Sequence, residues 1–356
     1  MKSSSGLHFI ALDHVRALAA FMVVTWHFIH ATNGYPVPFS YVPELFPLCL
    51  LDEGHTGVAL FMTLSGYLFA KLVDGKSISF GAFIWNRVLR LLPLLVIVIL
   101  ITGIKTLLDG MSLSNYVHYI MQGILLPTLP NGGWSITVEF HYYIMLPMLL
   151  WMLSKSNRWI LSIVALSIAL RFFLHHDRGE IQSLAYWTII GRIDQFALGM
   201  FVCQFRTHFA HCHKIALIAI LTLMMVYWYF DIQGGFYNYP SYPSHSPFWI
   251  ILPTIEGIAY AIGIAWYDNS FSFSTSGLSK FISLIGRYSY SIYLLHFFVV
   301  FAAAQFVNER IMSISNFYLA CFWSLIFFLL MMIPGYISFR FVESPFLKLR
   351  KNYIKK

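Results

Sequence analysis

The sequence predicts an all-α integral membrane protein, a bundle of about ten transmembrane helices with both termini in the cytoplasm. Of its 356 residues, 58% are hydrophobic and only 11% are charged. Soluble domains average about 45–50% apolar and about 25% charged residues, so a soluble fold could not cover this much apolar surface. Aromatic residues make up 18% of the chain, and such rings favour the membrane–water interface.

The predicted spans follow from the apolar runs, because a spanning helix needs about 20 mostly apolar residues. A shorter apolar stretch, 114–127, is expected to lie at the interface or to re-enter the membrane. We expect one transmembrane domain over residues 1–345 and a basic cytoplasmic tail over 346–356. The predicted spans are 14–32, 56–72, 84–104, 134–153, 158–175, 184–205, 214–231, 248–267, 280–307 and 316–341.

The distribution of Lys and Arg predicts the orientation. Net charge is +8, and the basic residues fall in short segments between apolar runs. With a cytoplasmic N-terminus, the outer side keeps only Lys105, Arg171, Arg178 and Arg310, and the inner side receives most of the others. This asymmetry follows the positive-inside rule. The positive charge therefore indicates topology, and no nucleic-acid partner is expected.

The outer loops and the cysteines carry weaker signals. The loops 33–55 and 232–247 are rich in polar and aromatic residues, which fits either stacking against sugar rings or ordinary turns. The four cysteines are scattered and form no CxxC pair, so we expect neither a disulfide framework nor a metal site.

The first span carries Asp13, Arg16 and His27, and ionisable residues inside a membrane need a reason. Eleven residues separate Arg16 from His27, about 20° more than three full turns and roughly 16 Å along the axis. Both side chains therefore share one face. Either His27 is a general base with Arg16 contacting an anion, or Asp13 pairs with Arg16 at a helix start and His27 is an interior histidine.

Arg87 and Arg90 precede Pro93 at the cytoplasmic start of the third predicted span. Residues three apart are neighbours on a helix surface. Two guanidinium groups there can bind phosphates, or they can serve only as positive-inside anchors.

Further polar residues occur in the fourth, sixth and ninth spans. Glu139 either orients His27 or pairs with Arg192. Each of these residues could also form structural hydrogen bonds between helices. Taken together with the first span, they predict a polar cavity inside the bundle. They are Ser135, Glu139, Arg192, Asp194, Tyr290, Tyr293 and His296.

The ordered motifs of this chain resemble those of the membrane acyltransferase-3 family, which includes O-antigen and other cell-surface polysaccharide O-acetyltransferases. The resemblance runs almost end to end, and six motifs in order are specific. One position departs from many relatives, because Ala59 stands where they carry an Asp. The motifs are Leu12 to Arg16 with His27, Gly57 to Tyr67, Arg87 to Pro93, Trp134 and Ser135 with Glu139, Tyr290 to His296, and Arg340 to Pro345.

The resemblance implies transfer of an acyl group, usually acetyl, from cytoplasmic acyl-CoA to a carbohydrate hydroxyl. The acceptor would be a cell-surface polysaccharide such as lipopolysaccharide O-antigen, or a lipid-linked glycan. It also implies a stand-alone transmembrane enzyme, in a bacterial inner membrane, without a tightly bound cofactor. Our mechanistic hypothesis makes His27 catalytic with Asp13 or Glu139 orienting it, and assigns CoA phosphates to Arg16, Arg87 and Arg90.

A transporter or flippase for a glycan or lipid-linked substrate is the alternative, because charges inside a membrane also mark transport pathways. The sequence shows neither an inverted repeat nor a pair of broken helices, which favours the enzyme.

Overall fold

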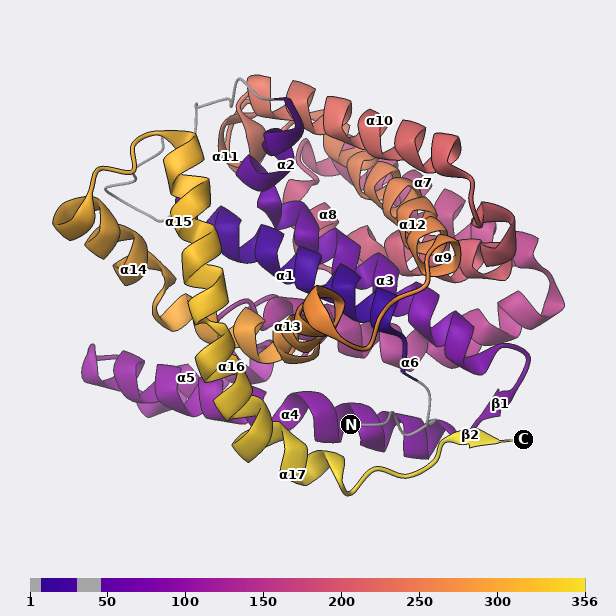
Figure 1. Cartoon of the computed structure of the whole chain (residues 1–356), viewed down its shortest axis with the longest axis horizontal. Coiled ribbons are helices and arrows are strands. Elements are labelled where there is room, and N and C mark those ends of the chain that lie inside the picture. The colour runs from indigo at the N-terminus through magenta and orange to yellow at the C-terminus, as the bar shows by residue number, and fades with distance from the viewer. Residues whose placement is uncertain (1–7, 31–45, 356) are drawn as a thin grey trace.

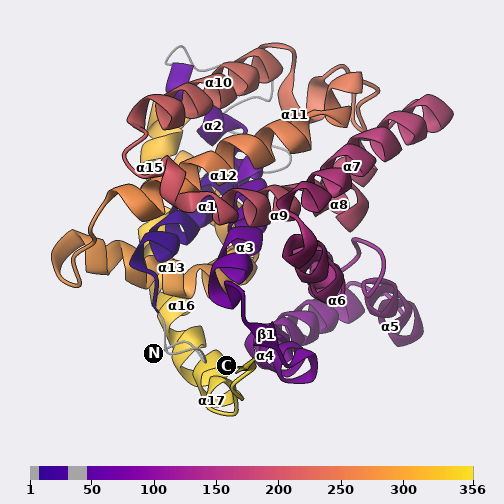
Figure 2. The same ribbon diagram turned by 90° about the vertical axis from the view of Figure 1, so that its right-hand side faces the viewer.

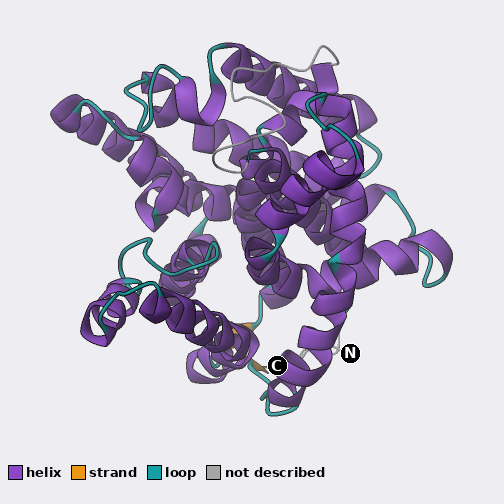
Figure 3. Cartoon of the chain, turned by 90° about the vertical axis from the view of Figure 1, so that its left-hand side faces the viewer, coloured by secondary structure: helices purple, strands orange, loops and turns teal. Residues whose placement is uncertain are grey.

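A computed structural model describes residues 8–30 and 46–355. The described chain is almost entirely helical (Figure 1 and Figure 3). Residues 33–45 of the predicted outer loop lie outside the described residues. The helices are α1 (Ile10–Ile29), α2 (Cys49–Asp52), α3 (Gly57–Val73), α4 (Phe80–Leu108), α5 (Leu113–Gln122), α6 (Trp134–Lys155), α7 (Asn157–Arg178), α8 (Gln182–Trp187), α9 (Ile189–Gln204), α10 (His213–Ile232), α11 (Gly235–Asn238), α12 (Leu252–Ser270), α13 (Gly277–Leu295), α14 (Val300–Phe306), α15 (Phe317–Leu330), α16 (Met332–Ser338) and α17 (Ser344–Leu347).

Seven helical segments of the described chain are long and apolar enough to cross a membrane. An eighth is added if Gly277–Phe298 and Val300–Ile311, which meet at a bend of 63°, count as one span. The structure therefore confirms an all-α, multi-pass membrane protein. The helix α5 has 10 residues, so the stretch predicted to be too short to span is indeed a short helix.

Two predicted spans correspond to helices that are shorter or less apolar. The span 184–205 is split at Thr188 into α8 and α9, and α9 has only 16 residues. The span 248–267 corresponds to α12, which has 19 residues and carries Glu256. Both α9 and α12 are packed within the bundle, where helix–helix contacts reduce the need for an apolar surface. The count of ten spans stays a prediction.

Burial separates central from peripheral helices. In α1 and in the segment Gly54–Val73, 78% of the apolar window is buried. The corresponding share is 28% for α4, 22% for α7 and 28% for α10, whose outer faces carry exposed Leu, Ile and Phe. Exposed apolar flanks of this extent suit contact with lipid tails. Figure 2 shows α1, α3 and α13 near the middle of the molecule.

Glycines allow the central helices to approach closely. A Cβ on Gly66 of α3 would lie 2.0 Å from the carbonyl oxygen of Phe196 in α9, and one on Gly199 would lie 2.1 Å from that of Thr63. A Cβ on Gly286 of α13 would lie 1.9 Å from the carbonyl oxygen of Asp13. Small residues at helix crossings are the usual device for close packing in membranes. These crossings hold α3 close to α9, and α1 close to α13.

The two ends of the described chain lie on the same side of the molecule (Figure 1). A short antiparallel pair joins β1 (Ser77–Ile78) to β2 (Ile354–Lys355). The side chain of Asn86 in α4 donates to the carbonyl of Lys351 over 2.7 Å and accepts from its N–H over 2.9 Å. The predicted basic tail is therefore packed against α4, and its Tyr353 is buried.

Candidate active site

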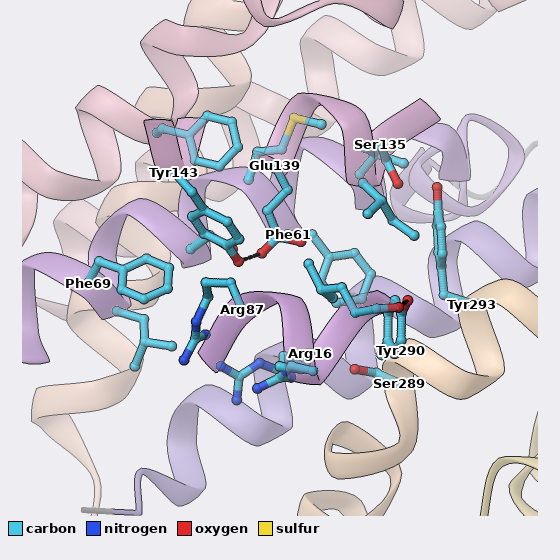
Figure 4. Close-up of a pocket in the computed structure, with 18 residues that line it drawn as sticks. Arg16, Phe61, Phe69, Arg87, Ser135, Glu139, Tyr143, Ser289, Tyr290 and Tyr293 are labelled. Carbon is cyan, nitrogen blue, oxygen red and sulfur yellow. Dashed lines mark hydrogen bonds between the residues drawn. The ribbon is translucent and has the colours of Figure 1, made fainter. Parts of the chain in front are cut away.

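A pocket inside the bundle collects polar residues from α1, α3, α4, α6 and α13 (Figure 4). We call it the inner pocket. Its walls are partly apolar, with Phe61 and Phe69 from α3 and Phe196 from α9. Seven of the residues selected from the sequence line it, although they come from four separate helices. They are Arg16, Arg87, Arg90, Ser135, Glu139, Tyr290 and Tyr293.

The arginines at one end of the inner pocket are only partly neutralised. Arg16 donates to Asp13 over 2.6 Å. Arg87 is buried, and its guanidinium lies 5.2 Å from the ring centroid of Phe69. Its Nε has no hydrogen-bond partner in the described part of the chain. Within the described residues, neither Arg87 nor Arg90 forms an ion pair. A cationic end without its full complement of carboxylates is suited to an anionic ligand.

The opposite wall of the inner pocket carries hydroxyl groups and a carboxylate. Glu139 accepts a hydrogen bond from Tyr143 one turn further along α6 (Figure 4). Ser135 and Tyr293 both donate to the carbonyl of Gly132, over 3.0 Å and 3.1 Å. Asp13 is held by Arg16 and His8, so the hydrogen bonds of the described residues join neither Glu139 nor Asp13 to His27.

His27 is oriented by a backbone carbonyl and by a second histidine. Its Nδ1 lies 2.9 Å from the oxygen of Val23 and 3.3 Å from Nε2 of His296. Nδ1 of His296 lies 3.1 Å from the oxygen of Ile292. Because a carbonyl only accepts, the hydrogen-bond network assigns the proton of each ring to Nδ1. His27 then keeps an unprotonated Nε2, which is the form a general base requires.

The histidine pair lies next to the inner pocket rather than on its wall. His296 is buried at the bend between α13 and α14, and its ring centroid is 6.1 Å from that of Tyr293, which lines the pocket. His27 is half-buried, and its ring is 5.1 Å from that of His296. A row of three side chains, Tyr293, His296 and His27, therefore leads from the pocket to the candidate base.

Comparison with protein families matches residues 9–333 to the model described as an acyltransferase domain, the acyltransferase-3 family. The chain belongs to this family.

Relatives of this acyltransferase-3 protein include O-acetyltransferase OatA of Staphylococcus aureus (strain NCTC 8325 / PS 47), which is 25% identical over 84% of this chain and 53% of its own length. A protein of Staphylococcus aureus (strain COL), named "Putative O-acetyltransferase", is 25% identical over 86% of this chain and 54% of its own length. The chain thus spans about half the length of these relatives. No solved structure matches it significantly.

Arg192 and Asp194 lie outside the inner pocket, in a separate buried network. Arg192 donates to Glu256 over 3.4 Å, not to Glu139. Asp194 accepts from Arg171 over 2.8 Å and from Thr254 over 2.5 Å. In this chain the network joins α7, α9 and α12.

Arg171 was assigned to the outer side of the predicted span 158–175, and no partner was predicted for it. It lies within α7, is completely buried, and also donates to the carbonyls of Ile250 and Gly191. A charged residue near the end of an apolar run was the available signal, and the carboxylate partner was 23 residues away in the sequence. Glu256 was missed for the same reason, since its partner residues lie in other helices.

A second cluster of ionisable residues surrounds the end of α1. His30 lies 3.2 Å from Asp52, and His55 lies 2.9 Å from Glu53. Burial raises the pKa of Asp52 to about 7, and burial together with neighbouring carboxylates raises the pKa of Glu53 well above its usual value. Among the described residues, no group of three or more His, Cys, Asp or Glu side chains is arranged to hold a metal ion.

Proposed function

We propose that this protein is a membrane O-acyltransferase that moves an acetyl group from cytoplasmic acyl-CoA to a hydroxyl of a cell-surface polysaccharide such as O-antigen. In this proposal it resides in a bacterial inner membrane, with ten spans and both termini in the cytoplasm. One observation carries it. The inner pocket joins an arginine-rich end to a wall that adjoins the His27–His296 pair.

The donor is proposed to enter at the arginine end. Guanidinium groups bind phosphates by paired, charge-assisted hydrogen bonds, and CoA presents phosphates at one end only. Arg16, Arg87 and Arg90 would hold that end, and the pantetheine arm would run along the apolar wall formed by Phe61 and Phe69. The thioester would then lie toward Ser135 and Tyr293.

His27 is proposed to act at Nε2 on the acceptor hydroxyl. It removes the hydroxyl proton as the oxygen attacks the thioester carbonyl, and the departing thiolate of CoA takes that proton from the imidazolium. Val23 and His296 accept from Nδ1–H and stabilise the imidazolium while it exists. This replaces our initial hypothesis that Asp13 or Glu139 orients the imidazole, because both carboxylates bond elsewhere.

Membranes containing the protein, incubated with acetyl-CoA labelled in the acetyl group, test this function. We expect label to appear as an alkali-labile ester on polysaccharide or lipid-linked glycan. A transporter, the alternative function, would move glycan across the vesicle membrane without attaching the labelled acetyl group to it. Absence of ester formation with a glycan supplied on either side of the membrane would contradict the proposal.

Replacing Arg87 and Arg90 together by glutamine is expected to weaken binding of CoA at least tenfold. Each lost charge-assisted hydrogen bond contributes about 1.5–3 kcal/mol. Isothermal titration of the purified protein with CoA provides the measurement. Arg340→Gln is the matched control, because Arg340 carries the same charge, donates to Tyr336 and does not line the inner pocket. If the double variant bound CoA with unchanged affinity, the two arginines would serve only to orient the protein in the membrane.

Replacing His296 by leucine is expected to lower the rate of acetyl transfer roughly tenfold to a hundredfold, because the His27 imidazolium loses an acceptor. The KM for acetyl-CoA should stay the same, since His296 does not line the inner pocket. His296→Gln keeps an acceptor oxygen and should recover part of the rate. A leucine variant with the full kcat would show that Val23 alone orients His27.

A further inference from the structure

A second pocket opens beside the inner pocket, and residues near both ends of the described chain, His8 and Tyr353, line it. We call it the entry pocket. The two pockets share Arg16, Leu68, Arg87 and Arg90, so these residues stand between them. The entry pocket adds further residues, among them Asp13, which the sequence analysis selected, and Arg350 from the predicted tail. The added charged or polar residues are His8, Asp13, Arg287, Glu343, Arg350 and Tyr353.

The entry pocket carries an excess of positive charge. Five arginines line it, against the two carboxylates of Asp13 and Glu343. Both carboxylates already have partners, because Asp13 accepts from Arg16 and Glu343 accepts from Ser291. Partly enclosed like charges repel one another unless an anion lies between them. The pocket is therefore incomplete without an anionic ligand.

Arg350 resembles Arg87 in having a buried Nε that has no hydrogen-bond partner in the part of the chain that the structure describes. Burial, together with the nearby Arg90 and Arg87, lowers the pKa of Arg350 to about 9. A guanidinium held next to two others, with a free N–H directed away from water, has the features of a vacant phosphate ligand.

The backbone places Arg350 at this position. The double hydrogen bond between Asn86 and Lys351 fixes the residue after Arg350 beside the residue before Arg87. The carbonyl of Tyr353 accepts from the N–H of Ser79, and β2 pairs with β1. These contacts join two segments separated by 265 residues and require no charge on Arg350. The side chain is thus presented to the pocket by the fold, not drawn there by a carboxylate.

We propose that the segment following α17 completes the donor site, with Arg350, Arg87 and Arg90 together binding a phosphate of the nucleotide end of acyl-CoA. This inference rests on the proposed acyl-CoA donor. The ligand class follows from the chemistry: three guanidinium groups match the charge and the several acceptor oxygens of a phosphate better than a single carboxylate. A phosphate of an anionic lipid shares this chemistry, so the test must separate the two sources.

The test measures binding of CoA and of acetyl-pantetheine, which lacks the nucleotide and its phosphates, to purified protein in nanodiscs of phosphatidylcholine. Arg350→Gln should weaken CoA binding roughly tenfold to a hundredfold and leave acetyl-pantetheine binding unchanged. Arg350→Lys keeps the charge and should recover part of the affinity. Lys348→Gln is the matched control, because exposed Lys348 lies two residues away and does not line the entry pocket.

The thermal midpoint without ligand separates binding from folding. Arg350→Gln should melt at the same temperature as the unaltered protein or higher, because it removes repulsion from Arg87 and Arg90. A lower midpoint combined with equal weakening for CoA and acetyl-pantetheine would assign Arg350 a structural role and overturn the proposal. An unchanged CoA affinity would overturn it too. The thermal midpoint is also measured with phosphatidylglycerol added to the nanodiscs. If Arg350→Gln loses only the rise in midpoint caused by this anionic lipid, the phosphate belongs to lipid and the proposal is wrong.

The variants also distinguish this inference from the proposed function. If the double variant Arg87→Gln with Arg90→Gln loses CoA binding and Arg350→Gln does not, acyl-CoA remains the proposed donor. The segment after α17 then has no part in the donor site. If the unaltered protein does not bind CoA, the donor assignment and the role of Arg350 fail together.

Discussion

Alanine in place of His27 is expected to reduce acetyl transfer by about 10²–10⁴-fold, the usual contribution of a general base. The physical reason is the tautomer: Nδ1 is engaged by Val23 and His296, so Nε2 is the nitrogen that can accept a proton. Ester formation from labelled acetyl-CoA, measured on membranes with matched protein content, gives the rate. Binding of CoA should persist, because His27 does not line the inner pocket.

His118→Ala is the matched control for this experiment. His118 lies on the exposed face of α5, and among the described residues its side chain bonds to Gln122 of the same helix. It should leave the transfer rate unchanged. If His27→Ala retained the rate of its control, the row from Tyr293 to His27 would have no part in the chemistry, and the proposed mechanism would be wrong.

Arg171→Met is expected to lower the free energy of unfolding by about 3–5 kcal/mol, the typical cost of removing one partner of a buried ion pair. Arg171 and Asp194 are both completely buried, and Arg171 also serves the carbonyls of Ile250 and Gly191. Its loss leaves the buried carboxylate of Asp194 without its cationic partner and removes the side-chain donor from two carbonyls, between α7, α9 and α12. The yield of folded protein and the thermal midpoint in detergent measure the effect.

A double variant tests the cause. Arg171→Met combined with Asp194→Leu removes both charges and should recover part of the stability lost in Arg171→Met. Arg178→Gln, an exposed arginine at the end of the same helix, is the control and should change the midpoint little. Equal midpoints for Arg171→Met and Arg178→Gln would show that the buried pair does not hold these helices together.

The inner pocket could be predicted from the sequence to an unusual extent. Arg87 and Arg90, Ser135 and Glu139, and Tyr290 and Tyr293 occur as local pairs at helical spacing, and each pair faces the same pocket. A polar group in an apolar run is expensive, so it marks an inward face even before its neighbours are known. His27 was selected by the same argument.

Partners could not be predicted, because they depend on distances between helices. Glu139 bonds with Tyr143, Arg192 with Glu256, and His27 with His296, and in each case the sequence also allowed another partner. Arg171 was assigned only to the outer side of the span 158–175, and its carboxylate partner in α9 was not predicted. Arg350 and Tyr353 lie in the segment 346–356, which was predicted only to be a basic tail.

The sequence by itself determined that this is a multi-pass α-helical membrane protein of the acyltransferase-3 family with a polar interior, because composition, helical period and motif order are local properties of the chain. The tertiary structure decided which polar residues line a pocket and which only join helices. Only the tertiary structure showed that Arg350 lies near Arg87. The physical reason is that these contacts join segments far apart in the chain. They are the close helix crossings at Gly66, Gly199 and Gly286 and the double hydrogen bond between Asn86 and Lys351.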